Sequence, residues 1–191
     1  MLSNFRTILV TTLLLLSVVP CLSAEEPSLY DPNRYGLMVI GSNSYSMEET
    51  INVVRLAGFA SFDYDKIWRH WAPDNLRWKV ELNTGLTVNP FVRSMSSLVM
   101  IAQLYIVREG WGALKIRPFI EGGVGCSYAD FRVRKQGSRS MFNPQFGAGT
   151  DFTIADQDLF LIVRQDHFSN GGLKEENRGL NFLSVYIGFY F

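Results

Sequence analysis

The chain has 191 residues, 18 basic and 18 acidic side chains, and an aromatic content of 14%. This length suits a single domain, and the balanced charge gives no sign of a nucleic-acid partner. Only Cys126 lies beyond the segment interpreted below as a leader, so a disulfide within the mature chain is excluded.

The first 24 residues, MLSNFRTILVTTLLLLSVVPCLSA, predict a secretory signal peptide. Arg6 precedes an apolar run that is too short to cross a bilayer as a helix, and small residues end the segment at Ala24. Acylation of Cys21 is the alternative, and the proline directly before this cysteine disfavours it. We therefore expect an exported mature chain of residues 25–191 that forms one β-barrel domain.

Eight strand-like stretches follow the leader, separated by turn-forming residues such as APDN, NP, KQGSRS and NGGLKEENRG. The stretch SSLVMIAQLYIV also fits a buried helix, but its length and its β-branched residues favour a strand. The predicted strands are Tyr35–Asn43, Val53–Tyr64, Leu76–Val88, Ser97–Val107, Ile116–Ala129, Asn143–Ile154, Leu159–Phe168 and Leu180–Phe191.

The last strand alternates apolar side chains with smaller or more polar ones. One face carries Leu183, Val185, Ile187, Phe189 and Phe191. A soluble sandwich would bury this face, whereas a membrane barrel would turn it toward lipid. Export, the even number of strands and the terminal Phe on an aromatic strand favour the barrel over a periplasmic β-domain. We therefore predict an all-β fold, an eight-stranded antiparallel transmembrane β-barrel of the Gram-negative outer membrane.

Charged side chains alternate with the apolar ones in several strands, and in a barrel they would face the lumen. A barrel of eight strands has a lumen that side chains fill, and buried charges need partners of opposite sign. We therefore predict an internal ion network rather than a transport pathway, formed by Arg77, Lys79, Glu81, Arg117, Glu121, Arg164 and Asp166.

Near the end of the chain, His167 precedes Ser169 by two residues. Strand parity places both side chains on the lipid-facing row, where polar groups are costly and often functional. If the hairpin is symmetric about Lys174, His167 lies opposite Asn181 on the next strand. Ser169, His167 and Asn181 would then supply a nucleophile, a base and an amide that orients the base. A plain polar pair near a turn is the alternative.

The longer pattern DHFSNGGLKEENRGLN, followed by the final aromatic strand, resembles the lipid A 3-O-deacylase family of outer-membrane enzymes. The segments RPFIEGGVG and FNPQFGAGTDF resemble middle strands of this family more weakly. The residues that match the family pattern are His167, Ser169, Asn170, Gly172, Asn177 and Gly179.

This resemblance implies a barrel with its active site on the membrane-facing wall. It implies hydrolysis of the ester that holds the 3-position acyl chain of lipid A, by a Ser–His–Glu triad without a metal or cofactor. By position, Ser169 would be the nucleophile and His167 the general base. Asn170, Gly172 and Asn177 would shape the oxyanion hole or bind substrate. Lipopolysaccharide and outer-membrane lipid are the expected partners, and a homodimer stays open.

One position departs from the family pattern, because Asn181 stands where the family has Glu. An amide oxygen can orient the imidazole by accepting its Nδ1 proton, but it does not stabilise the positive ring as a carboxylate does. Asn181 as the orienting group is the preferred interpretation. Substitution by Glu175 or Glu176 and a weak or inactive enzyme stay open.

The remaining candidates give weaker signals. His70 lies between Trp68 and Trp71, which suits an aromatic belt at the membrane interface. Two histidines and one mature cysteine offer too few ligands for a metal site. The alternative function is a non-enzymatic structural or adhesive outer-membrane barrel.

Overall fold

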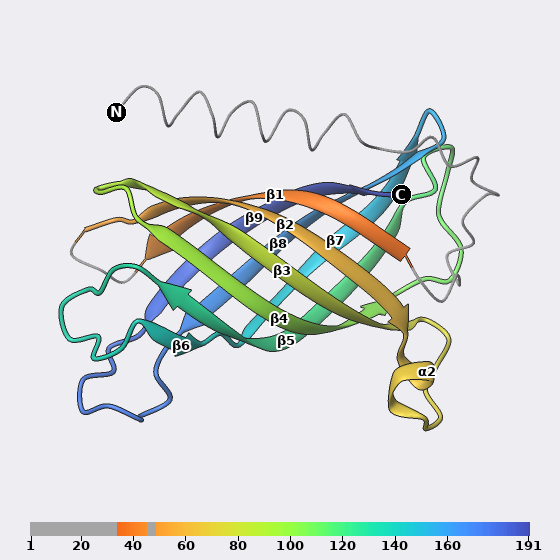
Figure 1. The fold of residues 1–191 in the computed structure, drawn as a ribbon. Coiled ribbons are helices and arrows are strands. Elements are labelled where there is room, and N and C mark those ends of the chain that lie inside the picture. The colour runs from red at the N-terminus through yellow and green to blue at the C-terminus, as the bar shows by residue number, and fades with distance from the viewer. Residues whose placement is uncertain (1–33, 46–48) are drawn as a thin grey trace.

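The computed structural model describes residues 34–45 and 49–191, so the predicted signal peptide of residues 1–24 and Cys21 lie outside the described residues. The described chain winds into an antiparallel barrel (Figure 1). Its strands are β1 (Arg34–Tyr45), β2 (Asn52–Asp63), β3 (Leu76–Asn89), β4 (Ser94–Tyr105), β5 (Arg117–Ala129), β6 (Ser140–Phe142), β7 (Gln145–Ile154), β8 (Gln157–Phe168) and β9 (Leu180–Tyr190).

Consecutive strands pair along the chain except β6 and β7, and β1 pairs with β9 to close the circle. Strands β6 and β7 both pair with β5 and are separated only by Asn143 and Pro144. They are therefore two parts of one barrel strand, and the circle has eight members. The predicted eight-stranded antiparallel barrel is confirmed.

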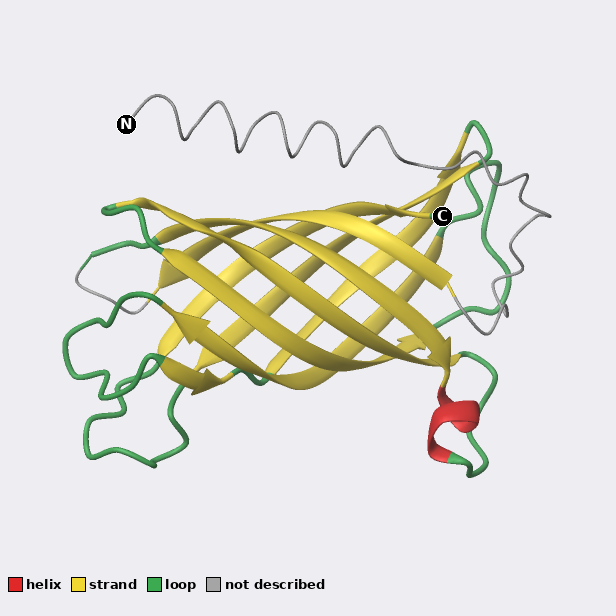
Figure 2. Cartoon of the chain, viewed as in Figure 1, coloured by secondary structure: helices red, strands yellow, loops and turns green. Residues whose placement is uncertain are grey.

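The strand boundaries differ from the predicted ones by a few residues. The ambiguous segment is a strand, β4, which runs from Ser94 to Tyr105 instead of Ser97 to Val107. The sequence interpretation missed α2 (Tyr64–Trp68), a helix of five residues at the end of the barrel that also holds the C-terminus (Figure 2). The helices of the described residues lack the length and hydropathy needed to cross a membrane.

The side chains of the lumen form the predicted ion network. Arg164 bonds to Glu81 at 2.7 and 2.8 Å and to Glu121 at 2.5 Å, and Lys79 lies 3.1 and 3.0 Å from the same two carboxylates. The other predicted members are also paired, Arg77 with Asp63, Arg117 with Asp151, and Asp166 with Arg55. All seven predicted members are buried, so the charges satisfy one another inside the barrel.

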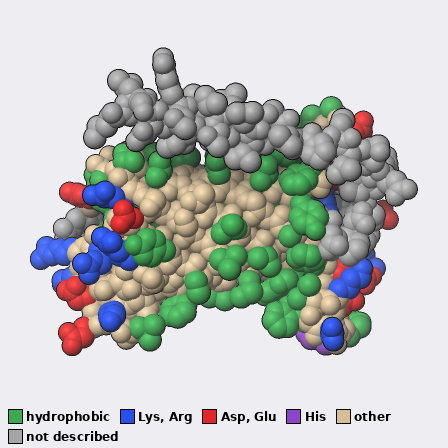
Figure 3. All heavy atoms as spheres, in the orientation of Figure 1, with side chains coloured by type: hydrophobic (Ala, Val, Ile, Leu, Met, Phe, Trp, Pro, Cys, Tyr) green, Lys and Arg blue, Asp and Glu red, His purple; other side chains and the backbone are tan. Residues whose placement is uncertain are grey.

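Apolar side chains close the lumen at the end that carries the β8–β9 loop. We call this group the apolar plug; its members are Ile51, Val53, Met95, Ala129, Phe131, Met141, Phe168, Leu180 and Phe182. On the outside, hydrophobic side chains spread over the barrel wall while charged ones gather at its two ends (Figure 3). This distribution is that of a barrel with a lipid-facing wall, and it leaves few charged groups on the wall itself.

Candidate active site

The β8–β9 hairpin brings His167 and Asn181 together. Their backbones are directly paired, as the symmetry of the hairpin predicted, and His167 Nδ1 lies 2.7 Å from Asn181 Oδ1. Because the amide oxygen only accepts, the Nδ1–H donates and the lone pair is on Nε2. Both side chains are half-buried on the outer face of the barrel. The ring is therefore held in the tautomer that a general base needs.

Ser169 directly follows β8, on the same face as His167. Its backbone is fixed by Phe142 of β6, through N–H to O distances of 2.7 and 3.0 Å in the two directions. Among residues 34–45 and 49–191, its hydroxyl has no hydrogen-bond partner, and no bond to His167 is formed. Residues two apart on a strand are separated by about 6 to 7 Å. The structure thus places the serine beside the imidazole without closing the contact between them.

The break between β6 and β7 supports the backbone of His167. The His167 N–H donates to the carbonyl of Pro144 at 3.0 Å, and Asn143 Nδ2 donates to the His167 carbonyl at 3.2 Å. Asn143 is fully buried, and its own Oδ1 accepts from Gln145. An irregularity in a strand commonly re-aims side chains near functional sites, and here it ties the strand to the histidine.

The loop after β8 is held by its own amide groups. Asn170 Nδ2 donates to the Glu176 carbonyl at 2.8 Å, and its Oδ1 accepts from the Gly172 N–H at 2.9 Å. The Asn170 N–H donates to Asn177 Oδ1 at 2.8 Å. Gly172 has a φ of +81°, which favours glycine. Asn170, Gly172 and Asn177 are therefore brought together, and the backbone N–H groups of the first two are occupied within the loop.

Gly179 contacts the imidazole from the other side of the loop. Its φ is +74°, and a Cβ at this position would lie 2.8 Å from His167 Cε1. Its N–H donates to Gln136 Oε1 at 3.0 Å. Gln136 is buried in the β5–β6 loop, more than forty positions earlier in the chain. Sequence reasoning missed it, because no short-range pattern links a loop glutamine to a distant glycine.

The other candidates lie elsewhere. Glu175 and Glu176 are exposed, and within the described part of the chain neither bonds to His167. Asp166 points into the lumen and pairs with Arg55, as strand parity indicated. His70 packs against Tyr64, the first residue of α2, with a ring-centroid distance of 5.5 Å, and α2 lies at the opposite end of the barrel (Figure 1). No group of three or more histidine, cysteine or acidic side chains in the described residues could hold a metal ion.

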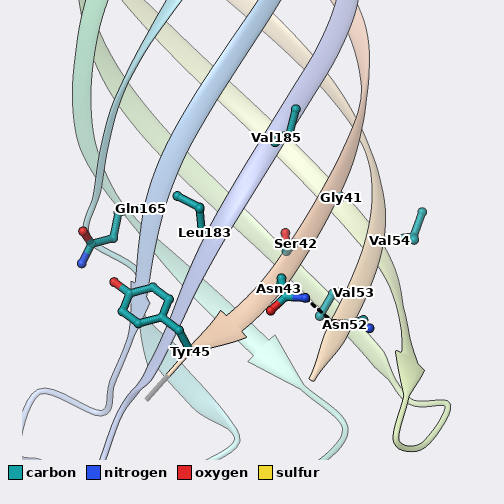
Figure 4. A pocket seen from close by; sticks show the side chains of 10 residues that line it. All are labelled: Gly41, Ser42, Asn43, Tyr45, Asn52, Val53, Val54, Gln165, Leu183 and Val185. Atoms are coloured by element: carbon teal, nitrogen blue, oxygen red, sulfur yellow. Dashed lines mark hydrogen bonds between the residues drawn. The ribbon is translucent and has the colours of Figure 1, made fainter. Parts of the chain in front are cut away.

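A shallow groove of about 870 Å³ lies on the outer wall and is lined by residues of β1, β2, β8 and β9 (Figure 4). Tyr45, one of its lining residues, is the backbone partner of Asn181, and Gln165 is two residues before His167. Leu183 lines the same side. A Cβ on Gly41 would meet nothing within 4 Å, so the surface is open there. The groove offers an apolar bed that begins next to the candidate base.

A family model described as lipid A 3-O-deacylase (PagL) matches residues 56–190, more than half of the chain. Among curated proteins, lipid A deacylase PagL of Pseudomonas aeruginosa (strain PAO1) is 38% identical over 74 residues. That match covers 37% of this chain and 41% of the relative, so it spans less than half of the relative's length.

Two solved structures have a similar fold. The crystal structure of the outer membrane enzyme PagL gives a TM-score of 0.57 at 24% identity, covering 79% of this chain and 97% of that one. The crystal structure of Neisserial surface protein A gives a TM-score of 0.57 at 10% identity, covering 84% of this chain and 97% of that one. At these identities the likeness shows the barrel fold alone. The family match extends over the β8–β9 hairpin and its loop, and the chain belongs to the lipid A 3-O-deacylase (PagL) family.

Proposed function

We propose that this protein is a serine esterase of the outer membrane that removes the ester-linked 3-O acyl chain from the lipid A part of lipopolysaccharide. The observation that carries the proposal is the 2.7 Å contact between His167 and Asn181, on a lipid-facing wall and two residues from Ser169. Family membership supports the reaction class. A lipid substrate would reach this wall by lateral diffusion in the membrane.

Ser169 would be the nucleophile and His167 the general base. Nε2 takes the proton from the serine hydroxyl while Oγ attacks the acyl carbonyl carbon. The imidazolium then gives this proton to the sugar oxygen, and the acyl group stays on Ser169. Water, activated by the same Nε2, releases the fatty acid and restores the serine. The first step requires the serine hydroxyl to approach Nε2 when substrate binds, as is common for catalytic contacts in unliganded enzymes.

The oxyanion of the tetrahedral intermediate needs donors that are not already used. The N–H groups of Asn170 and Gly172 bond within the loop. In the described residues, the Gly171 N–H and the Asn177 Nδ2 have no partner, so these two donors suit the oxyanion best. Asn170 and Gly172 then act indirectly, by holding the loop in its conformation.

Asn181 is proposed as the group that orients the base. It fixes the imidazole and its tautomer, but it gives the imidazolium less stabilisation than a carboxylate gives. Chemistry with an amide in this position is therefore expected to be slower than with an acid. The acyl chain of the substrate would lie in the groove over Gly41, because the groove begins beside Asn181 and is mostly apolar.

Mass spectrometry of lipid A after incubation with refolded protein tests this proposal. Wild type is expected to remove one hydroxyacyl chain, and Ser169→Ala is expected to lower the rate by about 10³-fold or more. Ser138→Ala, a loop serine outside the hairpin, is the matched control and should keep full activity. Intact lipid A after incubation with a correctly folded wild-type barrel would leave the structural or adhesive barrel as the better interpretation.

A further inference from the structure

A small pocket lies at the mouth of the barrel, at the same end as the candidate active site. Its volume is about 290 Å³, and we call it the mouth pocket. The connections β1–β2, β3–β4, β5–β6 and β8–β9 each contribute to its lining. These connections gather at one end of the barrel in Figure 1. All four meet here, so the pocket is a feature of the assembled rim and not of one loop.

Among the residues that the structure describes, three arginines and one acid line the mouth pocket. Arg132 and Arg134 come from the β5–β6 loop, Arg178 from the β8–β9 loop, and Glu49 from the β1–β2 connection. In the described residues, Arg132 and Arg134 are exposed and have no hydrogen bond or ion pair. The lining therefore carries an excess of positive charge.

Another arginine of the same loop is paired. Arg139 lies 3.4 Å from Asp130 and does not line the pocket. Arg132 and Arg134 have no carboxylate partner among the described residues and line one cavity, and two guanidinium groups placed in this way suit the binding of a phosphate. The β5–β6 loop is basic as a whole, and Arg132 and Arg134 are the two of its cations that line the pocket.

The floor of the mouth pocket is apolar. Ile51, which belongs to the apolar plug, lies beneath it, and Phe91 and Val133 pack against the plug. An anion that entered could not continue into the lumen, because the plug and the ion network fill it. The pocket is therefore a binding place and not the entrance of a channel.

The mouth pocket and the candidate active site share two consecutive residues of the β8–β9 loop. Arg178 lines the pocket, and the next residue, Gly179, packs against the ring of His167. The Arg178 N–H donates to the Lys135 carbonyl at 2.9 Å, which fixes this part of the loop against the β5–β6 loop. A molecule with its ester at Ser169 would have its headgroup beside the rim that carries the arginines.

We propose that the mouth pocket binds a phosphate group on the sugar headgroup of the lipid substrate, and so holds the substrate by its anion while the ester lies at Ser169. This inference rests on the proposed function. Arg132 and Arg134 supply the donors, and Glu49 opposes binding. The pocket selects phosphorylated glycolipids from the neutral lipids that also contact the wall.

Binding of lipid A to the full chain carrying Ser169→Ala tests the pocket without turnover. Titration calorimetry in detergent would use two probes, bisphosphorylated lipid A and the same lipid A with both phosphates removed. In the double variant Arg132→Gln/Arg134→Gln, the Kd for the bisphosphorylated lipid is expected to rise about tenfold or more, because each lost charge-assisted bond contributes on that scale. The Kd for the dephosphorylated lipid is expected to stay unchanged. Glu49→Gln should lower the first Kd.

The matched control is Arg108→Gln/Arg139→Gln, which removes two surface charges outside the pocket and should leave both Kd values unchanged. Equal loss of affinity for both lipids in the pocket variant, or no loss for either, would overturn the proposal. Inorganic phosphate is a third probe, added as a competitor of lipid binding. If it weakened the binding of the phosphorylated and the dephosphorylated lipid equally, the proposal would also be overturned. Failure of wild type to hydrolyse lipid A would instead count against the proposed function, because binding is measured separately.

Discussion

Strand β8 carries two rows of polar side chains, one on each side of the barrel wall. Arg164 and Asp166 point into the lumen, where each meets partners of opposite charge at 2.9 Å or less. His167 and Ser169 belong to the outward row, where only the histidine has a side-chain partner among the described residues. The charged groups of the inner row are all paired, whereas in the outer row the hydroxyl of Ser169 and the Nε2 lone pair of His167 have no partner among the described residues.

This difference separates polar residues that build the barrel from polar residues that are available to a substrate. Removing a member of the inner row strands a buried charge, which costs stability. Removing a member of the outer row costs little folding energy, because those groups are half-buried and few bonds depend on them. Variants that change stability without activity, or activity without stability, therefore test the assignment of each row.

The largest effect on stability is expected from Arg164→Met. Among the described residues, Lys79 would then be the only cation that pairs with Glu81 and Glu121, which leaves one buried negative charge without a partner. We expect the free energy of unfolding to fall by about 3 to 5 kcal/mol, measured by urea unfolding in detergent. Arg139→Met, at an exposed pair, is the control and should cost about 1 kcal/mol or less.

Activity per folded molecule of Arg164→Met should stay within about twofold of wild type, since Arg164 reaches only the backbone of His167, through Gln145 and Asn143, and bonds to neither catalytic side chain. An Arg164→Met barrel that keeps the wild-type free energy of unfolding but has lost esterase activity would contradict the division between the rows.

An intermediate effect, on rate alone, is expected at Asn181. Asn181→Glu should raise kcat by about tenfold or more, because a carboxylate stabilises the imidazolium that forms when His167 takes the serine proton. Asn181→Gln has the length of Glu without its charge and serves as the control. Equal rates for the Glu and Gln variants in an ester-hydrolysis assay would show that charge at this position does not limit the reaction.

The smallest effect is expected at the floor of the groove. Gly41→Leu adds a side chain where nothing lies within 4 Å, so the barrel should keep its stability. Hydrolysis of long-chain esters should fall several-fold, while that of a short-chain ester should not change. Gly58→Leu, at a glycine that does not line the groove, is the control. A loss for both chain lengths would mean that the groove does not hold the acyl chain.

The barrel was predictable because its signals are local. Alternation within each strand identifies the lipid-facing and lumen-facing rows, as in β9, where Val185 and Ile187 are exposed and Ser184 and Tyr186 are buried. The break at Asn143 and Pro144 and the short helix α2 were missed, because each spans only a few residues and interrupts a pattern without replacing it.

The candidate site was only partly predictable, for the same reason. The pairing of His167 with Asn181 follows from hairpin symmetry, since both belong to one hairpin. Gln136 reaches Gly179 from another loop, and no period in the sequence reports such a contact. The use of the Asn170 and Gly172 N–H groups inside the loop depends on turn geometry that residue types alone do not fix.

The partners of these two rows also differ in how far apart they lie along the chain. His167 and Asn181 are 14 residues apart within one hairpin, whereas Arg164 and Glu81 are 83 residues apart on strands that meet only in the finished barrel. Contacts between near neighbours cost little loop entropy and form early. The chemical pair can therefore exist in an isolated hairpin, while the groove over Gly41 needs β1 to join β9. The groove that would hold the substrate beside His167 and Asn181 therefore forms only when β1 pairs with β9 and closes the barrel.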